Sequence, residues 1–485
     1  MTAAASPFGP EPTTTASVTA LMPAIVPHNP TSTALGALGS RAMRSPRRTF
    51  WTLAAVVAVV ALVGAAAVVR DRGRVDQVDL YTLGIGVRPD GTVTTIPTDS
   101  DGAYLPGSRV LDPGPDATQA DRDAARALAE QTWTWLDAGT VPGAGGPHED
   151  LVTDALLDLH TLTLDGGAAV AGYSSKWRYV WPRDASFVAA ALTATGHHED
   201  AVEVFEFLDG VQHPDGSFEA RYLPDGSGPP DDRGLQTDGT GWVLWALAHV
   251  ADTLGPGPER ADLLRAFTPM IERSTGYLQA QVANPRSLPA PSADYWEHRE
   301  QALTLGTAGP VLAGLEAAEH LLDLLGRDDD AALAGADADR LHGAVLANFG
   351  QTGYGRYAGR SARDAATAFV LPPFQPEGLA GAAAAWEASI AEMIRPAGGL
   401  APGGSWPETS ISWTPQTSLY AWSAAANGQP ERAVEWLDWI AEHRTPLGAI
   451  PEKVGPDGSP AGVAPLMWSA AVVILTAAEL EESAP

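Results

Sequence analysis

The sequence predicts an all-α protein whose folded part is one toroid built from helical hairpins. Apolar residues recur at i, i+3 and i+4 spacing from Thr118 to Leu480, as they do in amphipathic helices. Turns rich in Gly and Pro separate these stretches, and no series of alternating apolar residues indicates a large sheet. About a dozen helices spread over roughly 360 residues match the size of a single helical toroid.

The N-terminal segment 1–49 is predicted to be disordered and basic. Residues 1–40 are mainly Thr, Ala, Pro and Ser. They contain few large apolar side chains whose burial could offset the conformational entropy lost on folding. Four arginines follow this stretch: Arg41, Arg44, Arg47 and Arg48.

Residues 50–69 form an uncharged run of 20 residues, the length of a membrane-spanning helix. The arginine cluster before the run predicts a single-pass protein of the cell membrane, with residues 50–69 in the lipid bilayer and the C-terminal domain outside. Alternatively, Arg47-Arg48 and the alanines at 65–67 indicate an export signal that is cleaved to release a secreted protein.

Residues 70–118 are rich in Gly, Pro, Asp and Thr, which predicts a linker or short hairpin with strands at 75–83 and 91–96. The main helical domain is expected to cover residues 119–485. Asp-Gly pairs at 215, 225, 238 and 457 indicate turns within it. Its predicted helices lie at 120–136, 186–195, 201–208, 242–254, 261–282, 307–325, 332–349, 378–394, 419–426, 433–443 and 466–480.

Composition excludes several classes of function. The chain carries a net charge of −29, and residues 1–74 are positive, so the remainder is more acidic still. A domain this acidic does not hold nucleic acid by charge. The absence of Cys excludes thiol catalysis and thiolate metal sites. The scattered His residues form no His-x-x-x-His run, so neither a metal nor another cofactor is expected.

A first polar motif, Lys-Trp-Arg-Tyr-Val-Trp-Pro-Arg-Asp, ends at Asp184 just before a predicted helix. Its proline suits the first turn of a helix. Arg183 can donate hydrogen bonds to sugar hydroxyls and Asp184 can accept them, while Tyr179 and Trp181 offer aromatic faces on which sugar rings stack. The alternative is a surface salt bridge beside buried aromatic residues.

A second motif, Leu-Gln-Thr-Asp-Gly-Thr-Gly, begins at residue 235 ahead of another apolar helix. Asp238 is a natural helix cap in this position. Alternatively, Gln236 and Asp238 line a sugar site.

Two glutamates lie in distinctive loop motifs, Glu297 in Asp-Tyr-Trp-Glu and Glu452 in Ile-Pro-Glu-Lys. Two carboxyl groups held across a sugar can split a glycosidic bond, because one donates a proton to the leaving oxygen and the other activates water. The charge of Lys453 is expected to keep Glu452 ionised, as a general base requires. The alternative for each glutamate is an exposed loop carboxylate.

Together, in this order, these motifs resemble the glucoamylase-like family of glycoside hydrolases, family 15, from about residue 165 to residue 480. The resemblance implies an (α/α)6 barrel in a membrane-anchored bacterial member and an exo-acting enzyme that cleaves α-glucosidic bonds with inversion. It implies that Glu297 is the general acid, that Glu452 is the general base, and that α-glucoside oligo- or polysaccharides or trehalose are substrates. Residues implied to bind sugar are Tyr179, Trp181, Arg183, Asp184, Gln236, Asp238, Trp296, His298 and Trp468.

Three positions depart from the family pattern. Ser405 replaces an Arg in Gly-Ser-Trp-Pro-Glu, His298 replaces a second acidic residue, and Lys453 replaces a common Gln. All three concern the leaving-group side of the site. They leave two alternatives open: a non-catalytic, membrane-tethered glycan-binding protein on the same fold, or another (α/α) toroid carbohydrate enzyme.

Overall fold

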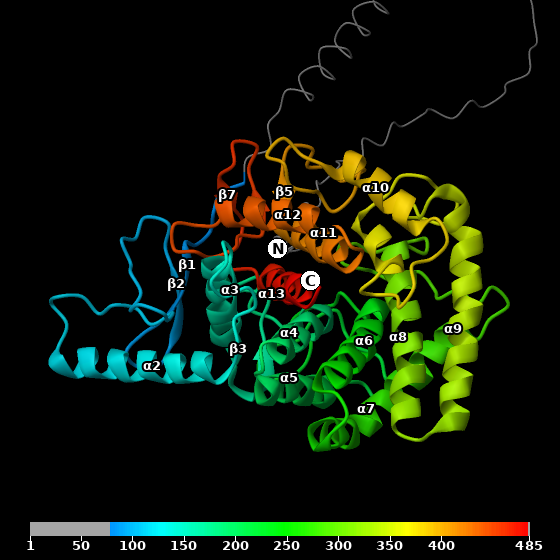
Figure 1. Cartoon of the computed structure of the whole chain (residues 1–485), viewed down its shortest axis with the longest axis horizontal. Helices are drawn as coiled ribbons and strands as arrows, with labels where there is room; N and C mark the ends of the chain where they lie inside the picture. The colour runs from blue at the N-terminus through cyan, green and yellow to red at the C-terminus, as the bar shows by residue number, and fades with distance from the viewer. Residues whose placement is uncertain (1–77, 484–485) are drawn as a thin grey trace, which may run out of the picture. The chain divides into compact units, whose positions relative to one another are not determined.

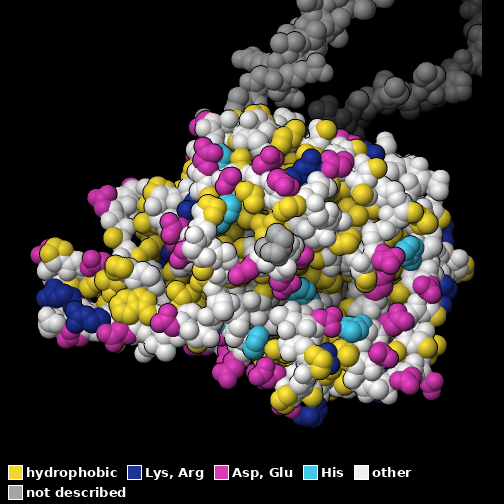
Figure 2. Space-filling view, viewed as in Figure 1, with side chains coloured by type: hydrophobic (Ala, Val, Ile, Leu, Met, Phe, Trp, Pro, Cys, Tyr) yellow, Lys and Arg dark blue, Asp and Glu magenta, His cyan; other side chains and the backbone are white. Residues whose placement is uncertain are grey.

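The computed structural model describes residues 78–483. The predicted disordered segment 1–49 and the predicted membrane segment 50–69 lie outside these residues. Within the described part, none of the helices combines the length and apolar character that a membrane span requires. Acidic side chains outnumber basic ones over the face shown in Figure 2, in line with 59 Asp and Glu against 30 Lys and Arg in the whole chain.

A short hairpin forms in this region, but the strand predicted at 75–83 is wrong for the described residues 78–83, and only the strand predicted at 91–96 is confirmed. Strand β1 (Gly84–Val87) pairs antiparallel with β2 (Val93–Ile96). Residues 78–83 run instead along a loop close to the C-terminus. There, the backbone N–H of Tyr81 donates to the carbonyl of Gly462 at 2.9 Å, and Thr82 Oγ1 donates to the carbonyl of Ala464 at 2.7 Å. Partners so distant in sequence leave no local pattern that could have predicted this pairing.

Twelve α-helices lie in the described residues, and eleven of them overlap the predicted ones (Figure 1). Helix α3 was not predicted; its buried residues include the charged Asp158, which interrupts the apolar pattern and pairs with Arg109 from a distant segment. The helices are α2 (Gln119–Ala138), α3 (Glu149–Leu162), α4 (Pro182–Ala194), α5 (His198–Val211), α6 (Thr237–Leu254), α7 (Pro258–Val282), α8 (Leu305–Leu324), α9 (Asp328–Asn348), α10 (Ala382–Met393), α11 (Thr414–Ala426), α12 (Pro430–Glu442) and α13 (Met467–Glu482).

Outer and inner elements alternate along the chain from α3 to α13. The inner ring runs through α4, α6, α8, the 3-10 helix η3 (Ala365–Val370), α11 and α13, and each packs on the next until α13 meets α4. The outer elements are α3, α5, α7, α9, α10 and α12. This arrangement is consistent with the predicted (α/α)6 barrel, with a short 3-10 helix in one inner position.

Inner helices are buried on all sides, so they need small residues where they cross. At the α6 and α8 crossing, a Cβ atom added to Gly241 would lie 2.1 Å from the carbonyl oxygen of Pro310. The barrel centre is filled by aromatic rings that include Phe187, Trp242 and Phe374, with centroids 5.3 to 6.1 Å apart. This packed core supports the loops at the ends of the inner helices.

Candidate active site

Arg183 joins three segments that are far apart in the sequence. Trp181 is extended and Pro182 starts α4, which places Arg183 and Asp184 in the first turn of that helix. Arg183 Nη2 lies 3.2 Å from Asp184 Oδ2 and 3.2 Å from Glu297 Oε1, and its Nη1 lies 3.4 Å from Asp238 Oδ2. One buried guanidinium therefore faces three carboxyl groups, all of them predicted site residues.

The carboxyl groups of Asp184 and Asp238 are almost completely buried. Burial raises the pKa of Asp184 to about 6 and that of Asp238 to about 7, although the charge of Arg183 lowers both. These values leave the two groups able to exchange protons near neutral pH.

The second motif belongs to the site and does not serve as a helix cap. Asp238 lies inside the first turn of α6, so the turn predicted at its Asp-Gly pair is wrong, and the N-cap residue Gln236 makes no side-chain capping bond. Gln236 Nε2 instead donates to Glu297 Oε2 at 3.0 Å. The N-terminal turn of α6 thus directs Gln236 to Glu297 and Asp238 to Arg183.

Glu297 ends a tight turn, in which its backbone N–H donates to the carbonyl of Asp294 at 2.7 Å. Its φ angle is +56°, in the left-handed region that is costly for a residue with a side chain. Its carboxyl group is buried and accepts hydrogen bonds from Arg183, Gln236 and Arg233. The strained backbone is therefore held at a position where several segments converge on one carboxyl group.

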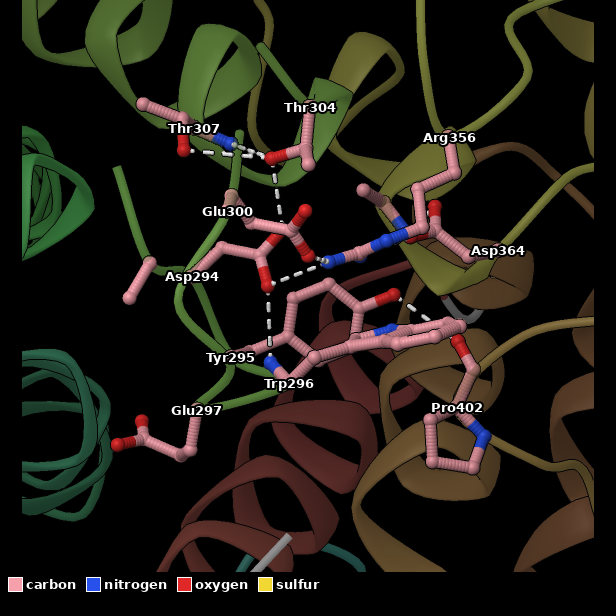
Figure 3. A network of polar contacts seen from close by, with 12 residues as sticks. Asp294, Tyr295, Trp296, Glu297, Glu300, Thr304, Thr307, Arg356, Asp364 and Pro402 are labelled. Carbon is pink, nitrogen blue, oxygen red and sulfur yellow. Dashed lines mark hydrogen bonds and ion pairs between the residues drawn. The ribbon is translucent and has the colours of Figure 1, made fainter. Parts of the chain in front are cut away.

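A polar network around Asp294 and Arg356 holds the loop that carries Glu297 (Figure 3). Asp294 accepts hydrogen bonds from the backbone N–H of Trp296 at 2.9 Å, from Thr304 Oγ1 at 2.7 Å and from Arg356 Nη2 at 3.0 Å. In Figure 3 the Glu297 side chain points away from this network.

Arg356 is the centre of that network. It also donates to Glu300 and Asp364, both at 2.6 Å, and its guanidinium lies 3.8 Å from the ring centroid of Trp296. These contacts fix the position of Trp296 and, through the turn, that of Glu297.

The predicted sugar-binding residues Trp296 and His298 lie beside the segment that carries Ser405. Trp296 meets the ring of Trp406 edge-on at 4.7 Å, and His298 stacks on Trp406 at 5.8 Å. Burial and the charge of Arg356 lower the pKa of His298, which favours the neutral ring. Where the family resemblance implies a second acidic group and an Arg, this chain therefore presents a neutral imidazole and an exposed serine.

Glu452 precedes β6 (Lys453–Val454), the middle strand of a small sheet with β5 (Ser412–Trp413) and β7 (Pro460–Ala461). The Glu452 backbone N–H donates to the carbonyl of Val463 at 2.8 Å. Gly462 has a φ of +75°, which favours glycine, and a Cβ atom there would lie 2.7 Å from Glu452 Oε2 and displace that carboxyl group.

The environment of Glu452 overturns the expectation that Lys453 keeps it ionised. Burial raises the pKa of Glu452 to about 8, and this effect outweighs the opposing charge of Lys453. Lys453 Nζ lies 4.2 Å from the ring centroid of Trp413 and 3.9 Å from Glu408 Oε2. The lysine is therefore engaged with other partners, and the buried carboxyl group favours its neutral form.

The remaining predicted residues lie near Arg183. Trp468 is fully buried, and the Arg183 guanidinium carbon lies 5.1 Å from its ring centroid. Tyr179 and Trp181 meet edge-on at 6.2 Å, and Arg221 covers both rings at 4.5 and 5.0 Å. The ring of Trp468 thus packs against the Arg183 guanidinium, and the ring of Trp181 packs against that of Arg221.

Sequence reasoning missed Arg221, Arg233 and Arg356. Arg233 stands in Asp-Asp-Arg-Gly only three residues before Gln236, and Arg356 stands in Gly-Arg-Tyr, so weak signals existed. Among residues 78–483, no group of three or more His, Asp or Glu side chains is arranged to hold a metal ion.

The fold and the site together define the class of a glucoamylase-like glycosidase fold, and comparison with known proteins supports this class. A solved wild-type glycosidase is 25% identical with a TM-score of 0.58, covering 69% of this chain and 96% of that protein. A bacterial glucoamylase complexed with acarbose is 15% identical with a TM-score of 0.57, covering 75% of this chain and 62% of that protein. A variant glycosidase solved in complex with glucose gives 24% identity and a TM-score of 0.57, covering 69% of this chain and 96% of that chain.

Two curated relatives are also similar in sequence, whereas no protein-family model matches the chain. The isomaltose glucohydrolase of Kribbella flavida is 26% identical over 362 residues, which span 65% of this chain and 88% of that enzyme. An uncharacterized glycosyl hydrolase of Methanocaldococcus jannaschii is 30% identical over 178 residues, 36% of this chain and only 27% of the archaeal protein. The homologues of this chain are thus glycoside hydrolases.

Proposed function

We propose that this protein is an exo-acting glycoside hydrolase that cleaves α-glucosidic bonds with inversion. The observation that carries the proposal is the convergence of Asp184, Asp238 and Glu297 on the buried Arg183, on a glucoamylase-like fold. The buried pair of Arg183 and Asp184 can bind the hydroxyls of a terminal sugar. An internal sugar would not fit, because the next sugar of the chain would have to occupy the space that these two residues fill. Exo action follows from that position.

In the proposed mechanism, Arg183 and Asp184 bind hydroxyls of the terminal glucose. Glu297 donates its proton to the glycosidic oxygen as the bond from that oxygen to the anomeric carbon breaks. In the reactive fraction of molecules Glu452 is ionised, and it accepts a proton from a water molecule that attacks the anomeric carbon from the opposite face, which inverts the configuration. The products are β-glucose and the shortened alcohol. Glu452 then returns its proton to the solvent, and Glu297 takes up a solvent proton for the next turnover.

The similarity to an isomaltose glucohydrolase supports a small α-glucoside as substrate, with isomaltose as the first to try. The departures at Ser405, His298 and Lys453 lie on the leaving-group side and are expected to select the linkage. We also propose that residues 50–69 anchor the protein in the cell membrane with the described domain outside. N-terminal sequencing of the mature protein tests this, since a start near residue 68 would indicate secretion after cleavage.

The first experiment is proton NMR of the full chain with isomaltose, maltose and trehalose, following the anomer that appears first. We expect β-glucose from one of these α-linked substrates. Initial release of α-glucose would overturn inversion. Binding of glucose by folded protein without any product would favour the non-catalytic glycan-binding alternative, and release of unsaturated or phosphorylated sugar would favour another toroid enzyme.

The pH profile gives a separate prediction. When a reaction needs one carboxyl group protonated and another ionised, the group with the higher pKa sets the pH above which the rate falls. Glu452 has a pKa of about 8, far above an ordinary carboxyl group. We therefore expect kcat/KM to fall above about pH 8.

Lys453→Met provides the matched test. It removes a positive charge that lowers the pKa of Glu452, so the descending limb should move to higher pH. Two results would contradict the assignment of Glu452 as the general base. One is a descending limb of kcat/KM at the same pH in Lys453→Met as in the wild type, and the other is a wild-type kcat/KM that does not change up to about pH 9.

A further inference from the structure

Arg233 contacts the proposed general acid from a loop that joins α5 to α6. Its Nη1 lies 2.9 Å from Glu297 Oε2, and its side chain is 18% exposed, compared with 2% for Arg183 and 0% for Glu297. Its Nε also lies 3.3 Å from Asp231 Oδ2, and Asp231 in turn pairs with Arg221. Arg233 is therefore shared between two carboxyl groups, one in the site and one in its own loop.

These contacts occupy one oxygen of Glu297 completely. Its Oε2 accepts hydrogen bonds from both Arg233 and Gln236, and its Oε1 faces Arg183. A carboxylate oxygen has about two lone-pair directions, so Oε2 is fully used. Oε2 can carry a proton and donate it to the glycosidic oxygen only after Arg233 or Gln236 has moved away from it.

Arg233 is the donor that can withdraw. Gln236 directly precedes α6 and Arg183 lies in the first turn of α4, and both side chains are buried in packed surroundings. The segment around Arg233 contains Gly226, Gly228 and Gly234 at positive φ, and much of it is exposed. Its displacement would uncover little apolar surface, and Asp231 remains beside Arg233 to retain the guanidinium.

We propose that Arg233 is a displaceable positioning residue, which holds Glu297 while the site is empty and is pushed onto Asp231 by the sugar of the leaving group. This inference rests on the proposed hydrolase function. No covalent bond changes in the displacement itself. As the guanidinium leaves, Glu297 takes up one proton from the buffered solvent and then transfers it to the glycosidic oxygen; Glu452 returns one proton to the solvent after turnover, so the protons balance. Binding of the leaving sugar thus promotes protonation of Glu297, the acid that protonates the glycosidic oxygen.

The test uses the full chain and Arg233→Gln, with two substrates. One is the disaccharide that the wild-type protein hydrolyses, and the other is α-glucosyl fluoride, which has no leaving sugar and needs no proton donor. We expect KM for the disaccharide to fall about fivefold, because binding no longer has to break a partly buried ion pair. KM for the fluoride should stay within about twofold of the wild-type value.

Asp231→Asn is the matched control, since it frees the loop from Arg221 but leaves the guanidinium on Glu297. It should not lower KM for the disaccharide. If Arg233→Gln does not fold, Arg233→Lys should lower KM in the same direction by a smaller factor.

Two results would overturn the inference while the hydrolase function stands. A rise in KM for the disaccharide would make Arg233 a sugar-binding arm, and equal changes for both substrates would make it a purely structural residue. Failure of the wild-type protein to hydrolyse either substrate would overturn the proposed function itself.

Discussion

Glu297→Gln should lower kcat for the disaccharide by about 10²- to 10⁴-fold, because the amide cannot supply the proton that the leaving oxygen needs. The single amide oxygen can keep the hydrogen bonds from Arg233 and Gln236, whereas the bond from Arg183 to the other oxygen is lost. The fold should therefore be retained with a modest loss of stability. The measurement is steady-state kinetics together with thermal unfolding.

The choice of substrate makes this prediction specific. Fluoride leaves without protonation, so hydrolysis of α-glucosyl fluoride by Glu297→Gln should fall far less than hydrolysis of the disaccharide. Glu387→Gln is the control, since this carboxylate pairs with Arg432 at the protein surface. Equal losses with both substrates would show that Glu297 is not the acid, and wild-type turnover would remove it from the mechanism.

Arg183→Met should have the largest effect on stability. The variant leaves Asp184, Asp238 and Glu297 buried without their common counter-ion. Breaking a buried ion pair in this way costs about 3–5 kcal/mol in the free energy of unfolding. Denaturant unfolding at pH 7 measures this loss, and hydrolysis should disappear with it.

The pH dependence of the Arg183→Met effect follows from the carboxyl groups. Burial already raises the pKa of Asp184 to about 6 and of Asp238 to about 7. Both groups become neutral as the pH falls, and neutral carboxyl groups need no counter-ion, so the destabilisation should be smaller at pH 5 than at pH 8. Arg265→Met, which removes an exposed partner of Asp262, should change stability little at either pH. A variant as stable as wild type at pH 8 would contradict the role given to Arg183.

Local patterns predicted most of the helices but not every element. The apolar pattern located eleven helices, which include outer helices with a polar face and inner helices that are buried on all sides. It failed for α3, whose buried residues include Asp158, paired with the distant Arg109. It also failed for residues 78–83, whose partners Gly462 and Ala464 lie nearly 400 residues away.

Some residues of the candidate site could also be predicted from the sequence, whereas other contacts could not. Arg183, Asp184, Gln236, Asp238 and Glu297 stand in motifs with unusual residue types, so the sequence singled them out and the structure brings them together. The contact of Arg233 with Glu297 could not be predicted, because a loop of Gly, Pro and Asp carries no period from which its path can be read.

By itself, the sequence determined a helical chain of toroid size, an acidic domain without thiol chemistry, and two glutamates in separate motifs. Only the tertiary structure decided that one guanidinium faces three carboxyl groups, that Glu452 is buried beside Gly462, and that Lys453 turns to Trp413 and Glu408. Residue type and spacing determine local conformation, whereas the charge state of a carboxyl group depends on its solvation and its neighbours, which distant segments supply only after folding.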